Sequence, residues 1–229
     1  MSEAKSRLTA VRVWDLPTRA FHWVLALTIV ASVVSAKIGG NAMLWHFRFG
    51  YVVFALVAFR VLWGLVGGRW SRCSSFVYSP GTVLRYLRGQ SRADEHHDVG
   101  HNPLGSFSVL ALLGFLALQV ATGLVADDEI ANVGPLNRFV SGSTAGQATH
   151  WHKDYGQWIL LGLVALHIAA ILYYLLAKKT NLVRPMLNGD KALPTGTPAA
   201  ADNVGTRLLA LVLAALCVGC AGWVASLGG

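Results

Sequence analysis

The sequence predicts an all-α fold, a transmembrane helical bundle, from its composition and from the length of its apolar segments. Hydrophobic residues make up 54% of the 229 residues and charged residues only 13%, and the mean hydropathy is +0.50. These values are typical of membrane proteins rather than of soluble domains. Five apolar segments are each long enough to cross about 30 Å of hydrocarbon as a helix. We therefore expect a multi-pass protein embedded in membrane lipid.

The predicted spans cover residues 19–36, 46–67, 104–126, 151–177 and 206–227. Turn and helix-breaking residues separate them, notably glycine, asparagine and proline. We expect residues 1–187 to form one membrane domain with four helices, residues 188–205 a linker, and residues 206–229 an additional C-terminal transmembrane helix. The basic start of the chain leads into the first apolar run without a signal-peptidase site, so this helix should remain in the mature protein.

The basic residues indicate the orientation of the spans. They gather before the first span, between the second and third, and between the fourth and fifth: Lys5, Arg7, Arg12, Arg19; Arg69, Arg72, Arg85, Arg88, Arg92; Lys178, Lys179, Arg184, Lys191, Arg207. The other two connections carry only Lys37 and Arg138, the latter near Asp127, Asp128 and Glu129. The positive-inside rule then places the N-terminus in the cytoplasm and the C-terminus in the periplasm. Because the cations do not form one continuous patch, nucleic acid is not an expected partner.

Four histidines lie in, or at the mouth of, the predicted spans: His22, His46, His152 and His167. A ligating side chain inside a membrane is costly, so each is a candidate functional residue. In the predicted topology His22 and His167 lie toward the cytoplasm, while His46 and His152 lie toward the outer side. Along one helix His152 and His167 are about 22 Å apart. Their side-chain directions differ by about 60° around the helix axis, so they lie close to one face. One helix could therefore serve two sites stacked across the membrane.

This arrangement predicts two haem b groups, an inner one held by His22 and His167 and an outer one held by His46 and His152. Two imidazoles on opposite faces of a haem iron leave no open coordination position, which suits electron transfer. No C-x-x-C-H motif is present, so the haems would be held non-covalently. His22 is the weak point of the pairing, because it lies close to the start of its predicted span. An earlier helix start would remove this difficulty.

Several neighbours of these histidines are also candidates. Gly50 and Gly156 follow His46 and His152 by one turn, where a flat macrocycle could approach the backbone. Arg60 lies inside the second span, and two interpretations stay open: it binds a propionate of the inner haem, or it extends to the inner membrane surface.

For several other residues we favour a structural role over a functional one. We expect Arg19, Arg69 and Arg72 to anchor the inner surface, although they could hold propionates or a quinone headgroup. Only one of His150 and His152 can face the outer site, because two residues along a helix are about 200° apart. His152 agrees better with His167, and His150 stays open as the alternative ligand. His96, His97 and His101 should be solvated in a cytoplasmic loop. Cys217 and Cys220 have C-x-x-C spacing in an apolar run, which favours helix packing over a redox role.

The residues assembled so far resemble the bacterial cytochrome b561 family, which includes the cytochrome b subunits of nickel-iron hydrogenases. The matching stretches cover about residues 11–187: Val13 to Arg19 with His22-Trp23, His46-x-x-x-Gly50, Arg60 to Gly64, Gly100 to Gly105, Thr122-Gly123, and His152 and His167 followed by Asn181 to Arg184. The resemblance implies a four-helix di-haem core, with His22, His46, His152 and His167 as ligands. The chain departs from it in two ways: the fourth-helix histidines are one residue further apart than in some relatives, and a fifth span follows.

The resemblance implies electron transfer across the bacterial inner membrane, as part of a respiratory chain. Electrons would pass between the quinone pool and a periplasmic or membrane redox protein, such as a c-type cytochrome or a dehydrogenase. Whether the chain is itself an enzyme stays open. One alternative is a superoxide oxidase that reduces quinone, although the acidic residues 127–129 disfavour an anionic substrate at that face. Another is a non-redox membrane anchor whose histidines are structural. The sequence does not indicate an oligomeric state.

Overall fold

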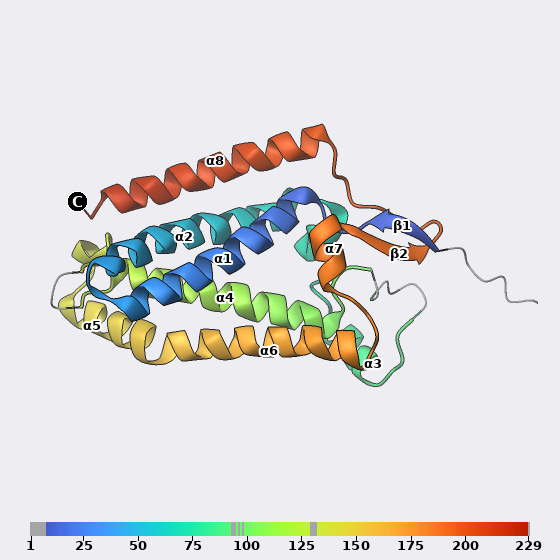
Figure 1. Cartoon of the computed structure of the whole chain (residues 1–229), viewed down its shortest axis with the longest axis horizontal. Helices are drawn as coiled ribbons and strands as arrows, with labels where there is room; N and C mark the ends of the chain where they lie inside the picture. Colours follow the sequence, from blue (N-terminus) through green and yellow to red (C-terminus); the bar gives the residue numbers. More distant parts are fainter. Residues whose placement is uncertain (1–7, 93–94, 96, 98, 129–131, 229) are drawn as a thin grey trace, which may run out of the picture. The chain divides into compact units, whose positions relative to one another are not determined.

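The computed structural model describes residues 8–92, 95, 97, 99–128 and 132–228. Within these residues five helical segments are long and apolar enough to cross a membrane. They are built on helices α1 (Leu16–Ile38), α2 (Met43–Val66), α4 (Pro103–Val125), α6 (Gln157–Leu176) and α8 (Val204–Ser226) (Figure 1). The prediction of an all-α transmembrane helical bundle is confirmed, with most span boundaries shifted by only a few residues.

The fourth span differs from the prediction, because it begins well before residue 151. Helix α5 (Gly142–His150) continues into a π-helical turn, Trp151–Gly156, and then into α6. The Ser141 hydroxyl caps the start of α5 by accepting a hydrogen bond from the Thr144 N–H at 3.2 Å. The small and polar residues of α5 hid this helix from a search for apolar runs, although a serine N-cap is a common helix start.

The chain divides into two compact units. Unit 1 comprises Met1–Ala20, Leu62–Val109 and Ile168–Ala210, and unit 2 comprises Phe21–Val61, Leu110–His167 and Leu211–Gly229. Each long helix thus contributes one segment to each unit. Most of the lysine and arginine residues fall in unit 1, whereas the four candidate histidines all fall in unit 2.

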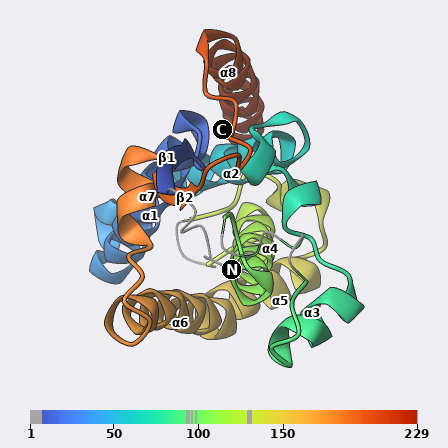
Figure 2. The ribbon, with the colours of Figure 1, turned by 90° about the vertical axis from the view of Figure 1, so that its right-hand side faces the viewer.

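Unit 1 contains a two-stranded antiparallel sheet that the sequence did not predict. Strands β1 (Leu8–Arg12) and β2 (Asp190–Pro194) pair in a register that runs from Leu8 opposite Pro194 to Arg12 opposite Asp190. Short helix α7 (Val183–Asn188) leads into β2 and lies beside the strands (Figure 2). The segment at 188–205 is therefore partly ordered as a strand and is not a plain linker. The division into domains at residues 187 and 205 itself stays a prediction.

Gly189 connects α7 to this sheet. Its φ of +93° is a left-handed conformation that glycine adopts without strain. Its carbonyl accepts hydrogen bonds from the N–H groups of Val13 and Trp14, at 2.9 and 3.0 Å. Around this junction lies a core of buried apolar residues: Val11, Val13, Trp14, Trp70, Val99, Leu193 and Ala200. A second short helix of unit 1, α3 (Pro80–Leu87), also lay outside the predicted spans and is capped by Ser79.

Candidate functional site

Unit 2 brings the four candidate histidines together as two pairs. The ring centroids of His22, on α1, and His167, on α6, are 6.4 Å apart. Those of His46, on α2, and His152, in the π-helical turn, are 5.9 Å apart. These are the pairs that the depth argument predicted. We call them the inner pair and the outer pair, after the predicted orientation.

The outer pair is oriented by backbone carbonyls. His46 Nδ1 lies 3.0 Å from the carbonyl oxygen of Ser32, and His152 Nδ1 lies 2.9 Å from that of Gln119. Since a carbonyl can only accept, each Nδ1 carries the proton and donates it. The Nε2 of each ring then has its lone pair available, which is the tautomer that a metal-binding imidazole needs.

Helix α4 shapes the position of His152. A Cβ atom at Gly123 would lie 3.0 Å from Cε1 of His152, so glycine allows the ring to approach α4 closely. Gln119 holds the same residue a second time, because its Nε2 donates to the His152 carbonyl at 3.2 Å. The Thr122 hydroxyl lies 3.3 Å from His152 Nδ1. The Thr122-Gly123 pair in the sequence therefore serves the placement of one imidazole.

His152 lies in a π-helical turn of the fourth span. A π turn closes with one more residue than an α turn, and such turns occur often at functional sites. Here the turn comprises Trp151–Gly156 and carries His152. Gly156 is buried within it, and a Cβ atom there would collide with the Gln119 amide. Gln119 thus fills the space beside Gly156, and an approach of a macrocycle to this glycine stays a prediction.

The outer pair lines a cavity of about 350 Å³. Gly50 also lines it, and a Cβ atom at Gly50 would meet nothing within 4 Å. The absent side chain therefore leaves open space one turn from His46, as the sequence predicted for an approaching flat group. Apolar side chains from α1, α2, α4 and α6 complete most of the wall, among them Ile29, Val33, Phe47, Val53, Leu116 and Leu160.

The inner pair depends on where α1 begins. The helix starts at Leu16, earlier than the predicted residue 19, which places His22 nearly two turns inside it. The depth difficulty noted for His22 is thereby removed. His22 Nδ1 is buried and has no hydrogen-bond partner among the residues that the structure describes. The ring packs edge-on against Trp23, with centroids 5.1 Å apart.

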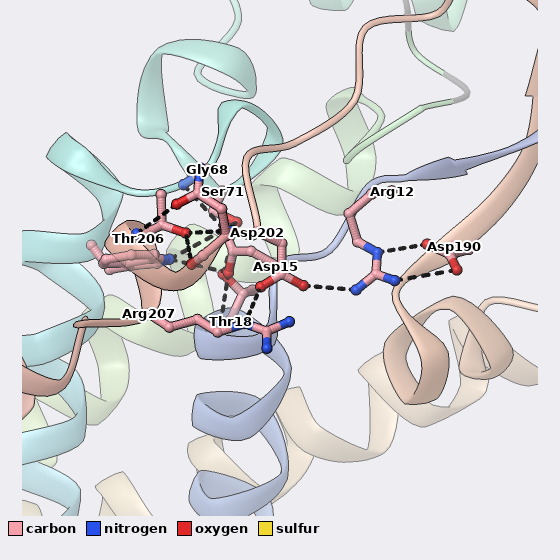
Figure 3. A network of polar contacts seen from close by, with 11 residues as sticks. Arg12, Asp15, Thr18, Gly68, Ser71, Asp190, Asp202, Thr206 and Arg207 are labelled. Atoms are coloured by element: carbon pink, nitrogen blue, oxygen red, sulfur yellow. Dashed lines mark hydrogen bonds and ion pairs between the residues drawn. The ribbon is translucent and has the colours of Figure 1, made fainter. Parts of the chain in front are cut away.

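The start of α1 is fixed by Asp15, a residue to which the sequence analysis gave no role. Asp15 is fully buried in unit 1 and is the N-cap of the helix, accepting from the Thr18 N–H at 2.8 Å. Its carboxylate also accepts from Trp63 Nε1 at 3.2 Å, the Gly68 N–H at 3.1 Å and the Ser71 hydroxyl at 2.8 Å (Figure 3). A buried aspartate that follows an apolar residue and precedes a Pro-Thr pair could have been recognised as a cap from sequence.

The candidate arginines lie in different surroundings. Arg60 is buried, with 4% of its surface exposed. This burial disfavours the interpretation that it extends to the membrane surface. Arg19 donates to the Leu187 carbonyl at 2.6 Å, and Arg72 Nε donates to the Gly67 carbonyl at 2.7 Å. These two guanidinium groups thus hold the ends of α7 and α2. Arg69 is exposed.

The remaining histidines are separate from both pairs. His150 is exposed and bonds through Nδ1 to Asp154 at 2.6 Å, so the structure brings His152 and not His150 to His46. The expectation that His97 is solvated is wrong: it is 6% exposed and packs between Tyr78 and Tyr86. His101 is half-buried against Trp14 and Phe76 and is not solvated either. His96 and Glu129 lie outside the described residues. Cys217 and Cys220 are free thiols in α8.

Two imidazoles with ring centroids 5.9 or 6.4 Å apart fit a haem better than a bare metal ion. Among the described residues no group of three or more His, Cys, Asp or Glu side chains could hold a metal ion. A haem iron carries four ligands of its own and requires only one residue on each face. The two histidine pairs and the open space at Gly50 therefore fit this group.

Comparison with known proteins agrees with this geometry. A family model described as prokaryotic cytochrome b561 matches residues 13–189. The chain is 24% identical to a probable Ni/Fe-hydrogenase B-type cytochrome subunit of Bradyrhizobium diazoefficiens, over 79% of this chain and 85% of the relative. The protein of that name from Rhodobacter capsulatus is 26% identical to the chain, over 82% of this chain and 84% of the relative. The probable Ni/Fe-hydrogenase 1 B-type cytochrome subunit of Escherichia coli K12 is 22% identical, over 84% of this chain and 95% of the relative. The chain therefore belongs to the prokaryotic cytochrome b561 family of b-type, electron-transferring membrane proteins.

Proposed function

We propose that the chain holds two haem b groups, one in each histidine pair, and relays electrons between the two sides of the bacterial inner membrane. His22 and His167 would ligate the inner haem, and His46 and His152 the outer one. When bound, each haem iron accepts and releases one electron. The protein would position the groups, and at the outer pair it holds Nδ1 of each imidazole on a carbonyl and lines the site with apolar side chains.

The spacing of the rings within each pair carries this proposal. Two metal–imidazole bonds of about 2 Å, plus the distance from each ligating nitrogen to its ring centre, put two such centroids roughly 6 Å apart. The observed separations are 6.4 Å for the inner pair and 5.9 Å for the outer pair. Arg60, buried in α2, supports the inner site as a cation for a propionate.

Two positions along one helix support a relay rather than a single centre. At 1.5 Å per residue, His152 and His167 lie about 22 Å apart, which is most of the hydrocarbon thickness. The inner site would exchange electrons near the cytoplasmic surface and the outer site near the periplasmic surface. The basic connections of unit 1 support this orientation. We propose quinone as the membrane partner of the relay.

The names of the relatives support a protein partner. The similar proteins are described as cytochrome subunits of Ni/Fe-hydrogenases. We propose that this chain likewise receives electrons from a hydrogenase or another dehydrogenase, with a periplasmic c-type cytochrome as the other candidate. Mixing the reduced partner with the oxidised cytochrome in proteoliposomes, and following haem absorbance, tests the transfer directly.

Haem quantitation of histidine variants tests the ligand assignment. We expect wild-type protein to contain two haems per chain. Each of His22→Ala, His46→Ala, His152→Ala and His167→Ala should lose one haem and keep the other, because each removes one of two axial ligands. His150→Ala is the matched control and should keep both. Unchanged stoichiometry in the four variants, or a colourless wild-type protein, would contradict the proposal, and the latter would favour a membrane anchor.

A further inference from the structure

The rim of the outer cavity carries charge, whereas most of its wall is apolar. The charged residues that line it are Lys37, at the end of α1, Lys153, in the π-helical turn, and Asp128, in the connection after α4. Both lysines are exposed. Their ammonium groups can therefore reach an anion at the mouth of the cavity without being buried there.

Gln157 connects the two lysines. The Lys37 ammonium donates to Oε1 of Gln157 at 2.9 Å, and Nε2 of the same amide donates to the Lys153 carbonyl. Lys37 also lies over the ring of Trp158, with 5.2 Å between Nζ and the ring centroid. These contacts hold the end of α1 against the turn that carries His152. The Lys37 ammonium and the backbone of Lys153 are thus held at the rim of the cavity that the outer pair lines.

Among the described residues that line the cavity, two are cationic and one is anionic. Within the described part of the chain neither lysine has an ion-pair partner. The Asp128 carboxylate accepts hydrogen bonds from the N–H and the side-chain amide of Asn132, at 2.9 and 2.6 Å, which stabilise the connection itself. The two lysine side chains are therefore available to bind an anionic group of a molecule in the cavity. An occupant with an apolar body and an anionic edge would match this lining best.

We propose that Lys37 and Lys153 form the binding site for the propionate carboxylates of the outer haem. This rests on the proposed function, because it assumes that a haem occupies the outer pair. A haem has the required shape, with an apolar macrocycle and two carboxylates at one edge. The lysines would place that edge at the mouth of the cavity and neutralise its charge. A nearby cation also favours the reduced, more negative state of the centre, so the pair would raise the outer haem's reduction potential.

Potentiometric titration of Lys37→Gln, Lys153→Gln and the double variant tests this site. Haem stoichiometry is measured first, and the His46→Ala protein, which should retain only the inner haem, identifies the inner potential. We expect each glutamine substitution to lower the outer haem's reduction equilibrium constant about tenfold, or about 59 mV for one electron, and to leave the inner haem unchanged. Arg138→Gln is the matched control. Arg138 lies in the connection after α4, as Asp128 does, but it does not line the cavity.

Lys37→Arg and Lys153→Arg separate charge from folding. Loss of the outer haem in the glutamine variants but not in the arginine variants would support the site. Two haems with unchanged potentials in the glutamine variants would overturn it, while the relay would stand. Loss of the outer haem in both series would also overturn it, because charge would then not be the cause. Wild-type protein without two haems would overturn the site together with the proposed function.

Discussion

The two units use their polar side chains in opposite ways. In unit 1 they bind one another: the Asp15 carboxylate accepts from four residues, and Arg12 bonds to Asp190 at 2.6 Å and to Asp202 at 2.7 Å (Figure 3). In unit 2 the four candidate histidines lie in two pairs, and backbone carbonyls hold the two rings of the outer pair. The polar groups of unit 1 thus bond to each other, whereas the outer pair of unit 2 lines a cavity that leaves room for a ligand. Substitutions in the two units should therefore have different effects.

The largest effect is expected from Asp15→Ala. The change leaves four buried donors without their acceptor, so it should destabilise the protein by about 3–5 kcal/mol. The thermal unfolding midpoint, followed by circular dichroism in detergent, should fall, and both haems should be released together. Asp15→Asn keeps one acceptor oxygen and should cost less. An unchanged midpoint in Asp15→Ala would refute the structural role assigned to this carboxylate.

A smaller and local effect is expected from Gly156→Ala. The new methyl group would collide with the Gln119 amide, and such overpacking costs about 1–3 kcal/mol. Because the strain falls on the turn that carries His152, the outer haem should be lost or weakened while the inner haem stays. Adding Gln119→Ala should restore part of the outer haem by making room. Gly162→Ala is the control, since a Cβ atom there meets nothing within 4 Å. Equal loss of both haems would contradict this assignment.

Gly50→Ala tests whether the open space belongs to a ligand. A Cβ atom meets no protein atom within 4 Å, so the apoprotein should unfold at the same temperature as wild type. Haem titration of the apoprotein should nevertheless show weaker binding at the outer site, by roughly tenfold, because the methyl group would enter space that the macrocycle needs. Gly114→Ala, on α4 and equally open, should change neither quantity. Identical haem affinity in Gly50→Ala would mean that the macrocycle does not approach this residue.

The smallest effect concerns pH and unit 1. Hydrogen bonds from the Arg85 side chain and the Arg92 N–H lower the pKa of Glu95 from 4.5 to about 2. Since the folded pKa lies below the ordinary value, the stabilisation is present above pH 4.5 and is lost as the pH falls toward 2. Proteolysis of the loop around Glu95 should therefore increase over this range. In Glu95→Gln the pH dependence should flatten, and an unchanged profile would count against these contacts.

The sequence was sufficient to predict the spans and the pairing of the histidines, because both depend on regular geometry. Apolar length determines where a helix can cross, and a fixed rise per residue determines which histidines share a depth. The open space at Gly50 could be predicted for the same reason, since Gly50 follows His46 by one helical turn. The choice of His152 over His150 also followed from helical angle.

The features that sequence could not predict depend on contacts between distant segments. Strand β1 is short and is stabilised by pairing with β2, far along the chain, so no local pattern marks it. Gln119 is one polar residue in an apolar helix, and its role appears only when Gly156 leaves room for it. The burial of His97 depends on Tyr78 and Tyr86, which come from outside its own loop. In each case the deciding partner is remote in sequence.

The β1–β2 pairing has a consequence for the order of assembly. Its two strands are separated by almost the whole membrane domain, and the Arg12–Asp190 contact within it joins residues 178 positions apart. During synthesis β1 emerges first and has no partner until four spans have been made and inserted. Closure of so long a loop is entropically costly and cannot precede the contacts that shorten it. We expect the sheet to form late in folding, only after β2 has left the ribosome and the four preceding spans have been inserted.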